Sequence, residues 1–308
     1  MSRKPAAVTL LCYRRQAGLR NQEPDSMSAE DTAKRVHRLS RQASAFFAQG
    51  RYKEAESLYR EALSLAEAGF GPDHIETATI INNLAVSYKY TGQFDGARQL
   101  YRRALLITEK TYGSDHTEAA TIWHNLGGLE HAAGNFAGGE PFARRSVKIR
   151  EKALGADHLD VAADVAALAA ILDGQKKHAE AERLYLRALA IFEKTFGPEH
   201  YEVAVNLNNL AANCHAQGRN EEAEQLYMRA LAIKRKLLGA EHPDVAVTAN
   251  NLAVFFKSQQ RLKEAERLYR CALGIFERAL GRKHPKYTAC LKNYSKLKKA
   301  TCAVRSEI

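Results

Sequence analysis

The four-residue stretch Gly71-Pro72-Asp73-His74 recurs along the chain, and its spacing decides the fold. Related turns that begin with glycine and end with histidine return every 42 residues. The six copies are Gly71–His74, Gly113–His116, Gly155–His158, Gly197–His200, Gly239–His242 and Gly281–His284. Self-similarity at such a period is typical of stacked supersecondary units that bury their apolar faces only against each other. The sequence therefore predicts a repeat array.

Each unit carries two helical patterns with a glycine between them. In the second unit the first helix has apolar residues three and four apart, at Ile81, Leu84, Ala85 and Tyr88. The next helix has Ala97, Tyr101 and Ala104 at the same kind of spacing. Such spacing places each set on one face of a helix. Small alanines at the closest approach allow two helices to pack tightly, and Gly92 suits the end of the first helix.

This unit resembles the tetratricopeptide repeat, whose ordinary period is about 34 residues. Segments 203–211 and 223–233 are similar to the kinesin light chain type, and the resemblance covers about residues 34–300. It implies an all-α, right-handed superhelical solenoid of antiparallel helix pairs, with a capping helix near 286–300. The expected pairs are 30–70, 76–112, 118–154, 160–196, 202–238 and 244–280. Segments 1–27 and 301–308 are expected to be disordered, on either side of an array over 28–300.

Two units depart from this pattern. Gly138, Gly139 and Pro141 stand where the second helix of the third unit should begin, and proline inside a helix costs about 3 kcal/mol. We therefore expect a frayed or delayed helix there, with a hinge as a further option. The fourth unit has Lys176 in place of the glycine between its helices.

The net charge of +11 lies mostly at the two ends of the chain. Residues 1–26 hold five basic and two acidic residues, and residues 282–308 hold eight basic and one acidic, which leaves +1 on the 255 residues between them. A nucleic-acid scaffold more often spreads basic residues along every repeat, so nucleic acid is an improbable partner. The basic N-terminal segment is open to three interpretations: a disordered tail, residues preceding a true start at Met27, or an organelle presequence.

Several function classes lack support in the sequence. The five cysteines form no CxxC pair, which favours a reducing, cytoplasmic location and argues against a structural metal site. Cys214 and Cys271 are expected in the core as small hydrophobes. The sequence has no apolar run long enough for a membrane span, and no nucleophile, phosphate-loop or dinucleotide motif. We expect no enzyme, no cofactor and no bound metal.

The turn residues are expected to be structural. One histidine per repeat keeps the six apart, whereas metal ligands must converge on one ion. A histidine that caps a helix or packs between units explains the pattern without a ligand. The residues concerned are Gly71, His74, Gly113, His116, Gly155, His158, Gly197, His200, Gly239, His242, Gly281 and His284.

Asparagines recur at one place in the first helix of the units. Asparagine is a poor helix-interior residue because its side chain competes for backbone hydrogen bonds, so its repetition needs a reason. One reason is a hydrogen bond that orders the stack, and the other is a carboxamide that binds a peptide backbone. In kinesin light chains, which this chain resembles, asparagines at this place contact cargo peptides. By that resemblance the peptide-binding role falls on Asn83, Asn125, Asn209, Asn251 and Asn293. The same concave, peptide-binding face is expected to carry Asn82, Lys89, His124, Asn208, Asn250 and Lys257. The fourth unit has Ala166 and Ala167 instead.

The sequence thus predicts a non-enzymatic interaction scaffold or adaptor that binds a peptide segment of a partner protein. The neutral-to-basic residues expected on the concave face favour a peptide with acidic residues. Two alternatives stay open, a structural subunit held by its edges and a nucleic-acid binder that uses the basic C-terminal end. The oligomeric state is open as well.

Overall fold

The described part of the chain is entirely helical. A computed structural model describes residues 29–306, and this range contains thirteen α-helices and no strand. The helices are α1 Ala29–Ala48, α2 Tyr52–Gly69, α3 Ile75–Tyr90, α4 Phe94–Tyr112, α5 Thr117–Ala132, α6 Phe136–Leu154, α7 Leu159–Gly174, α8 His178–Phe196, α9 Tyr201–Ala216, α10 Asn220–Leu238, α11 Pro243–Ser258, α12 Leu262–Leu280 and α13 Pro285–Ser306. The predicted disordered segment 1–27 lies outside the described residues.

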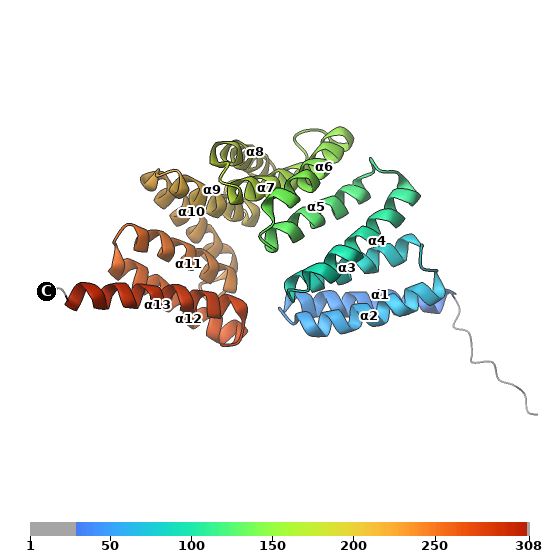
Figure 1. The fold of residues 1–308 in the computed structure, drawn as a ribbon, viewed down its shortest axis with the longest axis horizontal. Helices are drawn as coiled ribbons and strands as arrows, with labels where there is room; N and C mark the ends of the chain where they lie inside the picture. Colours follow the sequence, from blue (N-terminus) through green and yellow to red (C-terminus); the bar gives the residue numbers. More distant parts are fainter. Residues whose placement is uncertain (1–28, 307–308) are drawn as a thin grey trace, which may run out of the picture.

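The helices form six pairs that stack into a curved solenoid, which confirms the predicted fold class. Each odd-numbered helix packs on the even-numbered helix that follows it, and each pair packs on the next. The first helices also contact one another directly, from α3 to α5 and onward to α13. Figure 1 shows the pairs following an open arc, with α5 and α7 on its inner side and α6 and α8 on its outer side. The first helices therefore line the concave face.

The core repeats from unit to unit. Ala97, Tyr101 and Ala104 of α4 are completely buried, as their spacing predicts. The tyrosine at this position is also buried in the fourth and sixth units, as Tyr185 and Tyr269. Because alanine lets the helix backbones approach, each tyrosine fills the space beside the contact.

The turns between units are built by their glycine and histidine. Gly155 has φ +87° and ψ 155°, a conformation open almost only to glycine. His158 follows in extended conformation, and its Nδ1 accepts a hydrogen bond from the Asp160 N–H at 3.1 Å. Every one of the six turn histidines forms this bond with the N–H two residues later. Each histidine thus caps the helix that begins the next unit.

A basic side chain from the following unit holds each of the first five turns. Lys152 Nζ lies 2.8 Å from the Asp115 carboxylate, and the same pairing recurs 37 residues apart at the other turns. Those pairs are Lys110–Asp73, Lys194–Asp157, Lys236–Glu199 and Arg278–Glu241. In addition, Arg145 donates to the Ser114 carbonyl, an interaction that Arg103, Arg187 and Arg229 repeat at their own turns. The turn therefore links successive units.

The expected fraying of the third unit's second helix is wrong. Helix α6 begins at Phe136, directly after Asn135, whose side chain accepts the Gly138 N–H at 3.2 Å. Gly139 is needed for packing, because a Cβ there would lie 3.2 Å from the Gly127 carbonyl oxygen. Pro141 is exposed, and the hydrogen bond that it costs is the one that a backbone N–H at this position would donate. The side-chain cap and the close helix contact offset the cost of the proline.

Two other expectations need correction. Cys271 is exposed, because it occupies the outward position that Arg103, Arg145, Arg187 and Arg229 hold in earlier units, whereas Cys214 is buried. The final helix was expected to end near residue 300, with a disordered tail over 301–308. Helix α13 instead continues to Ser306, since no glycine or proline interrupts it after Pro285.

Within residues 29–306, none of the helices combines the length and the apolar character needed to cross a bilayer.

Candidate peptide-binding groove

The concave face is formed by one stripe of each first helix. In α3 this stripe is Glu76, Thr79, Asn83, Val86 and Tyr90, at steps of three and four, and all are partly or fully exposed. Helix-to-helix stacking aligns equivalent residues into columns that run along the groove. The groove thus has a central column of asparagines and two charged edges.

The asparagines form hydrogen bonds between repeats. Asn125 Nδ2 donates to Asn82 Oδ1 at 2.9 Å, Asn251 Nδ2 to Asn208 Oδ1 at 3.2 Å, and Asn293 Nδ2 to Asn250 Oδ1 at 3.3 Å. Within a pair the first asparagine donates to the second, as Asn208 does to Asn209 at 3.2 Å. These bonds order the stack in two blocks, one over α3 and α5 and one over α9, α11 and α13.

The second asparagine of several pairs keeps a polar atom free. The Nδ2 groups of Asn83 and Asn209 donate to no described protein atom, while their Oδ1 atoms accept from the neighbouring asparagine. Both side chains are half-buried and border the groove. The free amide N–H groups are therefore available to a backbone carbonyl of a bound chain.

The fourth unit interrupts this column and replaces it with an ion pair. The side chains of Ala166 and Ala167 cannot form hydrogen bonds. The link to the third unit passes through the side chain of Asp164 instead. Its completely buried carboxylate lies 2.7 Å from Arg150 Nη1 and 2.7 Å from His124 Nδ1. His124, predicted to face a peptide, thus serves an inter-repeat contact.

One edge of the groove carries lysines and histidines, with Asp173 at the equivalent position of the fourth unit. Lys89 lies at the end of α3, half-buried, with its Nζ 5.2 Å from the centre of the Tyr90 ring. Burial lowers the pKa of the Lys89 ammonium, and burial together with the Lys89 charge lowers the pKa of His131. Lys257 holds the equivalent position in α11. Lys89 and Lys257 form no ion pair with any described residue, so an incoming carboxylate would meet little competition.

The other edge is acidic, which differs from the neutral-to-basic surface expected from the sequence. Acidic side chains stand in the first turn of five first helices, at Glu76, Glu118, Asp160, Glu202 and Asp244. The sequence carries this signal, because each of these acidic residues follows its turn histidine by two positions. The face thus carries lysines and histidines along most of one edge and acidic residues along the other.

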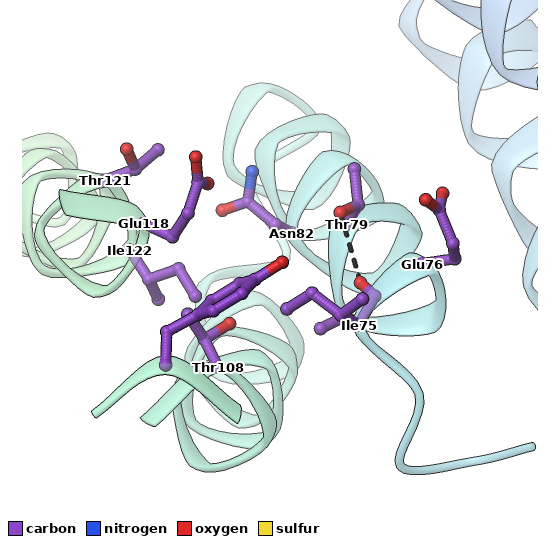
Figure 2. Close-up of a pocket in the computed structure, with 10 residues that line it drawn as sticks. Ile75, Glu76, Thr79, Asn82, Thr108, Glu118, Thr121 and Ile122 are labelled. Carbon is purple, nitrogen blue, oxygen red and sulfur yellow. Dashed lines mark hydrogen bonds between the residues drawn. The ribbon is translucent and has the colours of Figure 1, made fainter. Parts of the chain in front are cut away.

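A cavity of about 240 Å³ opens on the acidic edge between α3 and α5. Figure 2 shows Asn82 from α3 and Glu118 from α5 directed toward the same space. Thr108 and Tyr112 of α4 form its floor. Asn82 therefore also borders a polar recess.

The described residues contain no group of three His, Cys, Asp or Glu side chains arranged to hold a metal ion.

The tetratricopeptide repeat family model matches over residues 36–110, 76–152, 118–194, 162–236, 202–276 and 244–302. Among curated proteins, none matches the sequence closely enough to count as a relative.

Solved structures share the fold. A Podosopora anserina protein of nearly identical repeats, provisionally classed as a kinesin light chain, is 26% identical, with 67% of this chain and 98% of that chain covered and a TM-score of 0.54. BtubC from P. vanneervenii is 22% identical, with 88% and 92% covered and a TM-score of 0.53. A Rap protein complexed with Competence and Sporulation Factor is 17% identical, with 89% and 79% covered and a TM-score of 0.58.

The family model spans nearly all of the described helices, and the family and these neighbours fit a protein-interaction scaffold. The chain therefore belongs to the tetratricopeptide repeat family, with repeats like those of kinesin light chains.

Proposed function

We propose that the chain is a scaffold whose concave groove binds an extended segment of a partner protein. The observation that carries this proposal is the pair of free amide N–H groups, Asn83 Nδ2 and Asn209 Nδ2, on the groove surface. Because these N–H groups have no protein partner, they are available to donate to a peptide carbonyl in place of water.

The charged edges favour a peptide with a defined direction across the groove. Acidic side chains of the peptide face Lys89 and Lys257, where burial of Lys89 strengthens an ion pair that excludes water. Basic or neutral side chains of the peptide face Glu76 and Glu118 on the opposite edge. This distribution supports a segment with acidic residues on the side of Lys89 and Lys257, and it adds a preference for basic or neutral residues on the opposite side.

The break at Ala166 and Ala167 favours two separate contact regions. One lies over α3 and α5 and the other over α9, α11 and α13. A partner segment long enough to touch both crosses the fourth unit without asparagine contacts there. The Rap protein with Competence and Sporulation Factor is a precedent for a ligand complex on a similar fold.

The test replaces the free amides while keeping the stack intact. Asn83→Asp together with Asn209→Asp preserves the Oδ1 acceptors and removes the Nδ2 donors. A matched control replaces the exposed outer residues Arg183, Gln225 and Lys263 with alanine. Each protein is used as bait in the source cell, after circular dichroism shows equal helicity, and the captured segment is mapped by cross-linking.

We expect the aspartate variant to lose a partner that the wild type and the outer-face control both retain, with cross-links on α3 and α9. Retention of all partners by the aspartate variant would refute the groove as the binding site. Cross-links confined to α1 or α13 would instead favour a subunit held by its edges.

A further inference from the structure

A second cavity lies on the outer side of the solenoid, away from the asparagine groove. It has a volume of about 270 Å³ and opens between the second helices α10 and α12, with α11 as its floor. Its apolar lining is Met228, Leu231, Leu252, Phe256 and Leu268. The second helices of successive units do not pack closely on one another, and this spacing leaves the crevice open.

Met228 makes this stretch of the outer face apolar where other units are charged. The equivalent positions in four other units carry Arg60, Arg102, Arg144 and Arg270. Only the fourth and fifth units place apolar residues there, Leu186 and Met228, which are 47% and 51% exposed. An exposed apolar side chain at the mouth of an apolar cavity is a common mark of a binding surface.

The rim of the cavity carries arginines without carboxylate partners. At three other junctions a glutamate of one second helix pairs with an arginine of the next at 2.6 Å, in Glu67–Arg103, Glu151–Arg187 and Glu193–Arg229. At this junction the corresponding residues are Arg235 and Cys271. Arg235 and Arg267 form no ion pair with any described residue.

The third arginine of the rim is already neutralised. Arg261 pairs with Glu224 at 2.5 Å and with Glu264 at 2.6 Å. Arg261 and its two glutamates together carry a net charge of −1, and Arg235 and Arg267, which flank the opening on α10 and α12, bring the lining to +1. An apolar recess between two available guanidinium groups complements an apolar side chain that is flanked by carboxylates.

We propose that this outer cavity is a second docking site, which takes a partner segment with one apolar side chain between acidic residues. The site is independent of the concave groove, since its lining comes from α10, α12 and the opposite face of α11. With both surfaces occupied, the chain would join two proteins. The proposal goes beyond the groove function and stands whether or not the groove binds peptide.

The test uses a defined probe, a fluorescein-labelled peptide with a single phenylalanine between aspartates in a Gly/Ser frame. Two control peptides replace the phenylalanine with serine or the aspartates with lysine. Binding to the full chain is measured by fluorescence anisotropy. The test variants are Met228→Arg and Arg235→Glu, each of which introduces the residue type that other repeats carry at that position and so preserves the fold.

Two further variants serve as matched controls. Leu186→Arg changes the equivalent exposed position outside the cavity, and Asn83→Asp with Asn209→Asp changes the concave groove. We expect each test variant to weaken binding of the Asp/Phe probe by about tenfold or more, while both controls bind as the wild type does. Both control peptides should bind at least about tenfold more weakly than the probe.

Four results would overturn the proposal. The first is no saturable binding of the probe, and the second is equal binding by Met228→Arg and wild type. The third is loss of binding in the groove variant alone, which would assign the probe to the concave face. A concentration-dependent dimer in sedimentation that Met228→Arg abolishes would assign the cavity to self-association, which also contradicts a peptide site.

Discussion

Asn125 and Asn82 join two repeats through a hydrogen bond of 2.9 Å from Asn125 Nδ2 to Asn82 Oδ1. In each such bond the donor is the second residue of one pair and the acceptor is the first residue of the preceding pair. The two adjacent columns of asparagine therefore differ in role. The first column, which includes Asn82 and Asn208, accepts the bonds of the stack, whereas the second column retains the free groups at Asn83 and Asn209.

This division predicts that the two columns respond differently to substitution. Asn208→Ala should lower the free energy of unfolding by about 1–2 kcal/mol, because Asn208 is buried and both its acceptor and its donor are used. Asn209→Asp keeps the acceptor that Asn208 needs and should cost less than about 0.5 kcal/mol. Urea unfolding followed by circular dichroism measures both. Equal losses in the two variants would contradict the assignment of roles.

The buried ion pair between Arg150 and Asp164 allows a second prediction. Asp164→Ala should destabilise the chain by about 3–5 kcal/mol, because it leaves the Arg150 guanidinium buried without its carboxylate. Some units hold apolar residues at the equivalent positions, such as Ile122 for Asp164 and Phe192 for Arg150. Thermal unfolding of Asp164→Ala, compared with the wild type, measures the loss.

The matched control for that variant is the double substitution Asp164→Ile with Arg150→Phe. It should be nearly neutral or stabilising, because well-packed apolar residues can replace a buried pair. Asp164 Oδ2 and Arg150 Nε are buried without hydrogen-bond partners, so the pair is incompletely satisfied. A double variant as unstable as Asp164→Ala would show that packing at this site cannot adapt.

The sequence was sufficient to predict the helix pairs and the core, because these follow from local spacing. Ala97, Tyr101 and Ala104 lie at helical intervals and are buried, whatever their neighbours in space. The pairing of Lys152 with Asp115, in contrast, joins residues 37 positions apart and depends on how one unit stacks on the next. Such contacts become visible only once the stack is built.

The helix-breaking residues of the third unit also misled, because one of the two compensating contacts joins different helices. Pro141 argued against the start of α6, but the Asn135 cap and the contact between Gly139 and Gly127 outweigh it. Cys271 was assigned to the core by its residue type, although its register matches a column of exposed arginines. The free groups of Asn83 and Asn209 could not be predicted, because the sequence does not show which asparagine bonds to which.

A third prediction separates two kinds of glycine. The mid-unit position of Gly218 has φ +80°, and its equivalents Lys176 and Gln260 adopt φ 64° and 59°. Because asparagine tolerates the left-handed region, Gly218→Asn should cost less than about 1 kcal/mol. Gly197 has φ 83° and ψ 167°, which is open almost only to glycine, so Gly197→Asn should cost about 1–3 kcal/mol. The two melting temperatures measure this difference, and a similar shift in both would contradict it.

A fourth prediction concerns pH. Burial lowers the pKa of His215, of His131 beside Lys89, and of His284 beside Lys286, from the ordinary histidine value of 6.5. A histidine whose pKa falls on folding binds fewer protons in the folded state than in the unfolded state. Its contribution to stability is therefore complete above pH 6.5 and is lost as the pH falls through that value toward the folded pKa.

The free energy of unfolding should thus decrease between about pH 7.5 and pH 5, before carboxylate protonation dominates. His284 adds to this loss, because protonation of its Nδ1 removes the acceptor for the Lys286 N–H, which it holds at 3.1 Å at the start of α13. The variant His131→Gln with His215→Gln should show a shallower decrease, since it removes two of the three histidines whose pKa burial lowers. Urea unfolding at several pH values measures both slopes. A free energy of unfolding that rises as the pH is lowered, or a variant slope as steep as that of the wild type, would show that these histidines do not titrate with folding as their burial indicates.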